Sequence, residues 1–218
     1  MKKIKLFTLL SVLNLLLVAC IQVIVEDGNE NGKENTNSSS SSNSNNLKTG
    51  QVEIKGYPFS SGVISFTAAA KKITIDWGDD VIEEITLNGV ERTFTHKYPN
   101  SNIIKILINT ENMTSISYNW SNAHEARFGD CPNLEVIEIN HNNLTVFDLN
   151  RANNLIELNI GHNKLKAEVL NKIFESLPTR TTYSKREINV YNNPGESESD
   201  FHPEIAIRKG WIVTHMYL

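Results

Sequence analysis

The stretches LEVIEINHNNL (134–144) and LIELNIGHNKL (155–165) repeat one pattern at an interval of 21 residues. Both fit L-x-x-[LI]-x-I-x-x-N-x-L, so the apolar positions and the asparagine recur in register. A weaker copy, MTSISYNWSNA, begins 21 residues earlier at Met113. A unit of this length cannot bury its apolar face alone, so the pattern predicts that neighbouring repeats stack into a continuous core.

The pattern is the leucine-rich-repeat signature. Together with FGDCPNLEVIEI (128–139) and LTVFDLNRANNLIELNI (144–160), it resembles the surface lipoproteins called BspA-like. The segments LNKIFESLPTRT (170–181), INVYNNPG (188–195) and IAIRKGW (205–211) resemble the C-terminal end of such arrays. The resemblance implies an extracellular role in binding or adhesion.

The expected fold is mostly β with a few short helices. It is a short leucine-rich-repeat solenoid over 103–164, with a β-rich N-terminal cap over 50–102 and an α/β C-terminal capping repeat over 165–218. Apolar residues at helical spacing predict a helix over 167–177, which Pro178 stops. Ile188, Val190 and Asn193 repeat the I-x-I-x-x-N signature and predict a fourth, delayed repeat.

The cap over 50–102 is predicted from short β-branched or alternating runs separated by turn residues. Within it, ITIDWGDD (73–80) followed by FTHKYPN (94–100) resembles the WGDG…HTY pattern of PKD-like β-sandwich modules. The resemblance implies that Trp77 fills a core and that Gly78 allows a tight turn, with no chemistry of its own. Asp80 departs from the pattern, which prefers glycine there.

The clustered acids of this segment leave two interpretations open. Asp76, Asp79 and Asp80, with Glu83 or Glu84, are the hard oxygen ligands that Ca²⁺ prefers. Their spacing follows no recognised calcium loop, so a structural turn is favoured. We therefore predict neither a metal nor a cofactor.

The first 49 residues indicate export and attachment to a membrane. Residues 1–19 read as a lipoprotein signal peptide, in which lysines precede an apolar run and Leu17-Val18-Ala19-Cys20 resembles a lipobox. Cys20 would carry the lipid, and 20–49, rich in serine and asparagine, would form a disordered tether. The alternative is an uncleaved membrane anchor. The expected location is the bacterial cell envelope, as an outer-membrane lipoprotein facing the surface or the periplasm.

Net charge and cysteine content indicate which partners and which chemistry are disfavoured. Without the three lysines of 1–19, 18 of the 21 basic residues remain against 25 acidic ones, a net charge of −7. This balance disfavours nucleic acid as a partner. With Cys20 lipidated, Cys131 is the remaining thiol, and it shares a repeat position with Thr110 and Ala152. It is predicted to be buried and inert.

The outward positions of the repeats hold the candidate ligand-binding residues. Trp120, His141 and His162 lie 21 residues apart and should form a column along one edge, able to stack a sugar or an aromatic ligand. The alternative is that they are variable turn positions. Neighbouring outward strand positions complete the candidate set with Glu138, Asn140 and Asn159.

No catalytic motif is present, so an enzyme is not expected. The sequence predicts a non-catalytic cell-envelope lipoprotein that binds a protein or a glycan through its repeats. One alternative is a structural component of an envelope complex. Another is a ligand-capturing accessory of an enzyme system.

Overall fold

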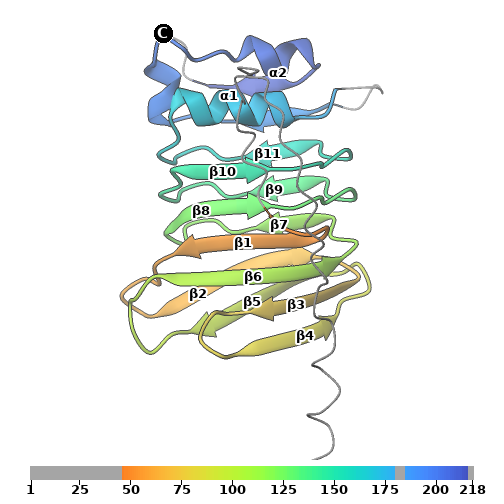
Figure 1. Cartoon of the computed structure of the whole chain (residues 1–218), viewed down its shortest axis with the longest axis vertical. Coiled ribbons are helices and arrows are strands. Elements are labelled where there is room, and N and C mark those ends of the chain that lie inside the picture. Colours follow the sequence, from red (N-terminus) through yellow and green to blue (C-terminus); the bar gives the residue numbers. More distant parts are fainter. Residues whose placement is uncertain (1–45, 180–184, 216–218) are drawn as a thin grey trace, which may run out of the picture. The chain divides into compact units, whose positions relative to one another are not determined.

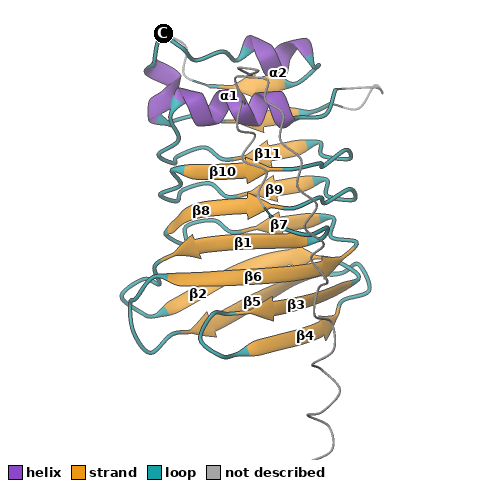
Figure 2. Cartoon of the chain, viewed as in Figure 1, coloured by secondary structure: helices purple, strands orange, loops and turns teal. Residues whose placement is uncertain are grey.

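The computed structural model describes residues 46–179 and 185–215, which belong to one compact unit, Ser42–Leu218 (Figure 1). The predicted signal peptide, Cys20 and the tether up to residue 45 lie outside the described residues. Strands dominate the described part, and its helices are short and lie toward the C-terminal end (Figure 2). No helix in this part of the chain is long and apolar enough to cross a membrane.

Two mixed β-sheets organise the fold. The first has the order β10-β8-β1-β6-β3-β4, and the second has the order β13-β12-β11-β9-β7-β2-β5. The six strands of the first are β1 (Gln51–Gly56), β3 (Lys72–Asp76), β4 (Ile82–Thr86), β6 (Ile104–Glu111), β8 (Ala123–Phe128) and β10 (Val146–Leu149). The seven strands of the second are β2 (Val63–Ala69), β5 (Glu91–Lys97), β7 (Ser115–Ser117), β9 (Val136–Glu138), β11 (Glu157–Asn159), β12 (Glu187–Asn189) and β13 (Ile212–Thr214).

Alternation of apolar and polar residues decides which face each strand buries. In β1, Val52 and Ile54 are buried while Glu53 and Lys55 remain partly exposed, as a period of two requires. The buried side chains of both sheets form a single apolar core that extends from Val52 to Val213.

The early strands join the repeat strands side by side. β1 pairs antiparallel with β8, and β2 pairs antiparallel with β7. Beyond these junctions the pairing becomes parallel, β8 with β10 and β7 with β9. The rings of Phe66 in β2 and Tyr118 after β7 are 6.0 Å apart, so the core also crosses the junction.

The predicted fold class is therefore wrong. The expected leucine-rich-repeat solenoid with separate caps is replaced by a β-sandwich-like fold, in which sheets of six and seven strands share one core. The physical reason lies in the N–H and C=O groups at the open edges of β7 and β8, which must find hydrogen-bond partners. β2 and β1 supply those partners and fuse the repeats with the antiparallel strands.

Within the second sheet the repeats keep their 21-residue register. Ile116 lies opposite Ile137, and Ile137 lies opposite Leu158. Ile188 in turn lies opposite Leu158, so the delayed repeat extends the same sheet. Val213 of β13 pairs with Ile188 and adds the last strand.

The inserted helix is α1 (Ala167–Ser176), and its C-cap is Leu177, the residue before Pro178. Its buried face includes Leu170, Ile173 and Phe174. The 3-10 helix η1 (Pro194–Ser197) and the short helix α2 (Glu204–Arg208) follow β12. Together these elements cover the C-terminal end of the core.

Candidate functional site

Three buried asparagines fix the turns that follow the repeat strands. The Asn142 carboxamide oxygen accepts the backbone N–H groups of Ser121 (3.0 Å) and Ala123 (2.9 Å). Its amide donates to the carbonyl oxygen of Tyr118 at 2.7 Å. Asn163 and Asn193 make the equivalent bonds in the next two repeats. This ladder satisfies buried backbone groups and holds successive turns in register.

His141 and His162, which precede Asn142 and Asn163, adopt a left-handed backbone, and so does Trp120 at the equivalent position before Ser121. The φ angles of Trp120, His141 and His162 are 54°, 53° and 55°. Such a conformation is uncommon outside glycine and asparagine and costs about 1–3 kcal/mol per residue. The backbone N–H of each donates to the next repeat, for example from His162 to the carbonyl oxygen of Tyr191 at 2.7 Å. The ladder therefore enforces the conformation that brings the three side chains together.

The rings of this column stack face to face. The centroids of Trp120 and His141 are 3.6 Å apart, and those of His141 and His162 are 4.1 Å apart, with both pairs of planes inclined by 10°. Both faces of His141 are thus covered, and the imidazoles turn their edges outward. Trp120 is 64% exposed, and the indole face away from His141 remains open. The column offers one aromatic platform and a row of ring nitrogens.

The column extends one residue further than the sequence analysis predicted. Asn192 precedes the ladder residue Asn193, has a φ of 63°, and its amide nitrogen lies 2.9 Å from His162 Nδ1. Asn192 was missed, although the match of Asn193 to Asn163 already places it in register with His162. The Tyr191 ring meets His162 edge-on at 5.5 Å. We call Trp120, His141, His162 and Asn192 the aromatic column.

A second row of polar residues runs beside the aromatic column, on the other side of the ladder. Asn122, Asn143 and Lys164 are again 21 residues apart, and the Asn143 amide donates to the Asn122 carboxamide oxygen at 2.6 Å. Between the two rows, at the last repeat, lies an open hollow of about 290 Å³. His162 and Lys164 both line it.

The three residues predicted as ligand contacts all make hydrogen bonds within the protein, Glu138 and Asn159 through their side chains and Asn140 through its backbone. Glu138 accepts hydrogen bonds from the Ser117 hydroxyl (2.9 Å) and the Asn119 amide (3.3 Å). The backbone N–H of Asn140 donates to the Asn119 carboxamide oxygen at 2.9 Å. Asn159 accepts a long bond from the N–H of Gly161, at 3.4 Å.

A metal ion does not fit between the two histidines. The lone pairs of imidazole lie in the ring plane, and planes that are almost parallel direct them along parallel lines rather than toward one point. No group of three histidine, cysteine or acidic side chains that could hold a metal is found in 46–179 and 185–215.

The WGD segment has the contacts of a structural turn. Asp76 accepts the N–H of Gly78 at 2.9 Å, and Asp79 lies 2.7 Å from His96 Nε2. The Trp77 indole is buried and donates to Glu83 at 2.9 Å. Asp80 has a φ of 68°, which explains why a glycine is preferred there. The acids point to separate partners, an arrangement that favours a turn over a cation site.

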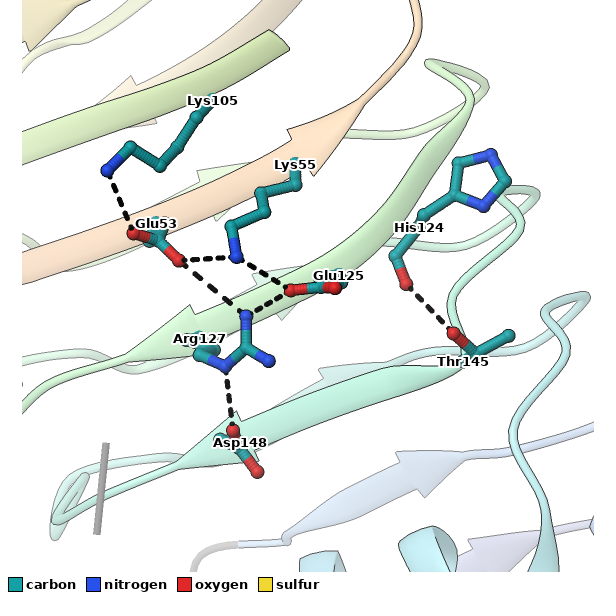
Figure 3. Close-up of polar contacts among 8 residues, drawn as sticks. All are labelled: Glu53, Lys55, Lys105, His124, Glu125, Arg127, Thr145 and Asp148. Atoms are coloured by element: carbon teal, nitrogen blue, oxygen red, sulfur yellow. Dashed lines mark hydrogen bonds and ion pairs between the residues drawn. The ribbon is translucent and has the colours of Figure 1, made fainter. Parts of the chain in front are cut away.

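The outer face of the first sheet carries a balanced network of charges (Figure 3). Arg127 pairs with Glu125 and lies 3.1 Å from Asp148, while Lys55 lies 3.1 Å from Glu125. The hydrogen bond from Arg127 lowers the pKa of Glu125, against the effect of burial. Glu53 and Lys105 complete a set of three cations and three anions. The six charges neutralise one another, so this network offers no net charge to a ligand.

Cys131 is 3% exposed, and burial raises the pKa of its thiol to about 11. A thiol that stays protonated at neutral pH is a poor nucleophile. Its position beside the core agrees with a packing role.

No protein-family model matches the chain, and no curated protein or solved structure matches it either.

Proposed function

We propose that the described unit is a non-catalytic module of the cell envelope that binds a glycan along the aromatic column. The open indole face of Trp120 carries the proposal. This large aromatic ring is 64% exposed, although His141 is stacked on one of its faces.

A glycan matches the chemistry of the aromatic column better than an apolar surface does. The polarised C–H groups of a sugar ring pack on the electron-rich face of an indole. Sugar hydroxyls can then exchange hydrogen bonds with the outward nitrogen atoms of His141 and His162. The amides of Asn122, Asn143 and Asn192 add further donors and acceptors beside them.

Attachment to the membrane is a separate part of the proposal and rests on residues 1–49. The Leu17-Val18-Ala19-Cys20 pattern supports a diacylated Cys20, and two chains suffice for stable anchoring. Mass spectrometry of the membrane-bound protein should find a chain that begins at a diacylated Cys20. A membrane-bound chain that retains residues 1–19 and carries no lipid would instead support an uncleaved anchor.

The binding role is tested on a printed array of oligosaccharides with wild type, Trp120→Ala and Ile82→Ala. Ile82 is an equally exposed apolar residue, at 66%, on the distant edge strand β4. We expect wild type and Ile82→Ala to share a binding profile that Trp120→Ala loses. If the array stays blank while a stoichiometric envelope protein co-purifies equally with all three proteins, the assembly role is favoured.

A further inference from the structure

The hollow at the end of the aromatic column presents hydrogen-bond donors to solvent. It is lined by His162, Lys164, Asn192, Pro194 and Ser197, with the buried Asn163 and Asn193 at its base. At about 290 Å³, it is close to the lower limit of small-molecule sites, roughly 300 Å³. One sugar ring or its substituent is an occupant of suitable size.

The two asparagines at the base are not free to bind a ligand. The Asn163 amide donates to the carbonyl oxygen of Ile139 at 2.8 Å, and its oxygen accepts the N–H of Leu144 at 3.0 Å. Asn193 is bonded in the same way to Val190 and Leu165. Polar contacts with a ligand are therefore left to the other four polar residues of the lining, which we call the rim: His162, Lys164, Asn192 and Ser197.

The rim carries a cation and no carboxylate. Lys164 is exposed, and within the described residues its ammonium group makes no ion pair or hydrogen bond. The nearby Glu196 is buried, accepts the backbone N–H of Asn193 at 2.8 Å, and does not line the hollow. The charge at this corner is opposite in sign to that of the whole chain, which is −4.

His162 adds a directed donor. Its Nδ1 lies 2.9 Å from the amide nitrogen of Asn192. An amide that donates to Nδ1 requires the tautomer with its proton on Nε2. His162 belongs to both the aromatic column and the rim of the hollow, so the two are continuous. Stacked strands lie about 4.8 Å apart, and Trp120 and His162 are two repeats apart, a span comparable to a disaccharide.

We propose that the hollow takes the anionic group of an acidic sugar, a carboxylate or a sulfate, whose glycan continues along the column to Trp120. This inference rests on the proposed glycan binding and specifies its ligand class. Lys164 supplies the charge, and His162, Asn192 and Ser197 supply hydrogen bonds.

The test uses oligosaccharides in matched pairs. Uronic-acid oligosaccharides are compared with their methyl esters, and sulfated oligosaccharides with their desulfated forms. The proteins are wild type, Lys164→Met, and Lys97→Met, which removes the same charge from an exposed position on β5. Affinities are measured at low and at high ionic strength.

We expect wild type and Lys97→Met to prefer the acidic member of a pair by about three- to fivefold, the upper part of the range for a solvent-exposed ion pair. Lys164→Met should bind both members equally, and salt should remove the preference of wild type. The class that shows the preference, uronate or sulfate, identifies the anion.

Equal binding of acidic and neutral members by wild type overturns the inference. Glycan binding itself then still stands if Trp120→Ala abolishes it. If wild type binds no member of any pair, both the inference and the proposed glycan binding are wrong.

Discussion

The indole of Trp120 and the imidazole of His141 lie face to face, with centroids 3.6 Å apart and planes inclined by 10°. The contact closes one side of the indole and leaves the other to solvent. His162 closes the second face of His141. Stacking between equivalent residues of neighbouring repeats thus produces an aromatic platform at Trp120, followed by the ring nitrogen atoms of His141 and His162.

The stack should suppress protonation of His141. Burial, and then the proximity of His162, lowers the pKa of His141 below its ordinary value of 6.5. In His162→Asn we expect this pKa to rise toward 6.5, since the new side chain is smaller and carries no charge. NMR titration of the ring protons measures it, with Ile82→Ala as a control that should change nothing. A pKa of His141 that stays the same in His162→Asn contradicts the stacked arrangement.

The lowered pKa of His141 also determines whether protonation of this residue stabilises or destabilises the fold. The unfolded chain protonates His141 more readily than the folded chain, so acidification through pH 6.5 favours unfolding through this residue.

Substitution of Asn142 should lower the stability of the fold more than substitution of most other polar residues. Asn142→Ala leaves the buried backbone groups of Ser121, Ala123 and Tyr118 without partners. We expect the free energy of unfolding to fall by about 2–4 kcal/mol, since each unsatisfied buried group costs about 1–3 kcal/mol and water relieves part of it. Urea denaturation measures the loss. Asn154→Ala, at an exposed position, is the control, and similar losses in both variants would refute the ladder.

The charge network of the first sheet should stabilise the fold only above acidic pH. The Arg127 hydrogen bond lowers the pKa of Glu125 below 4.5 in the folded protein. The stabilisation is thus complete above the unfolded pKa and is lost as pH falls through the lower, folded value. Melting temperatures of wild type and Glu125→Gln should converge over this range. Glu91→Gln, which removes an exposed carboxylate from β5, should follow wild type throughout, and a constant gap for Glu125→Gln would show that its pKa is not lowered.

The thiol of Cys131 should be unreactive in the folded protein. The Cys20→Ala variant leaves one thiol in the chain, so modification by Ellman's reagent reports on Cys131 alone. Burial and a pKa of about 11 predict slow reaction in buffer and stoichiometric reaction in denaturant. Rapid reaction in buffer would mean that the site opens readily.

The repeat period predicted which residues of successive repeats meet. Ile137 and Leu158 pair as expected, and Trp120, His141 and His162 form one column. A fixed period defines neighbours within the array, because each strand must pair with the equivalent strand of the next repeat. It contains no information about ring orientation, which depends on side-chain rotation. The open face of Trp120 was therefore not predictable.

The repeat period and the local strand signals could not predict the fold class. Gly56 of β1 lies opposite Ala123 of β8, and Ala68 of β2 lies opposite Ile116 of β7. These partners are far apart in the chain and share no motif, and they meet only through strand pairing and the shared core of the folded protein. Local signals correctly indicated strands in 50–102 but could not show that those strands continue the sheets of the repeats.

The central claim, that a glycan covers the free face of Trp120, is open to a direct optical test. The chain has three tryptophans, and Trp77 and Trp211 are 0% and 2% exposed. Acrylamide quenching of the intrinsic fluorescence therefore reports mainly on Trp120. Titration with the oligosaccharides that bind on the array is predicted to protect the fluorescence from acrylamide in step with binding. An oligosaccharide that binds tightly and leaves acrylamide quenching unchanged would contradict the account.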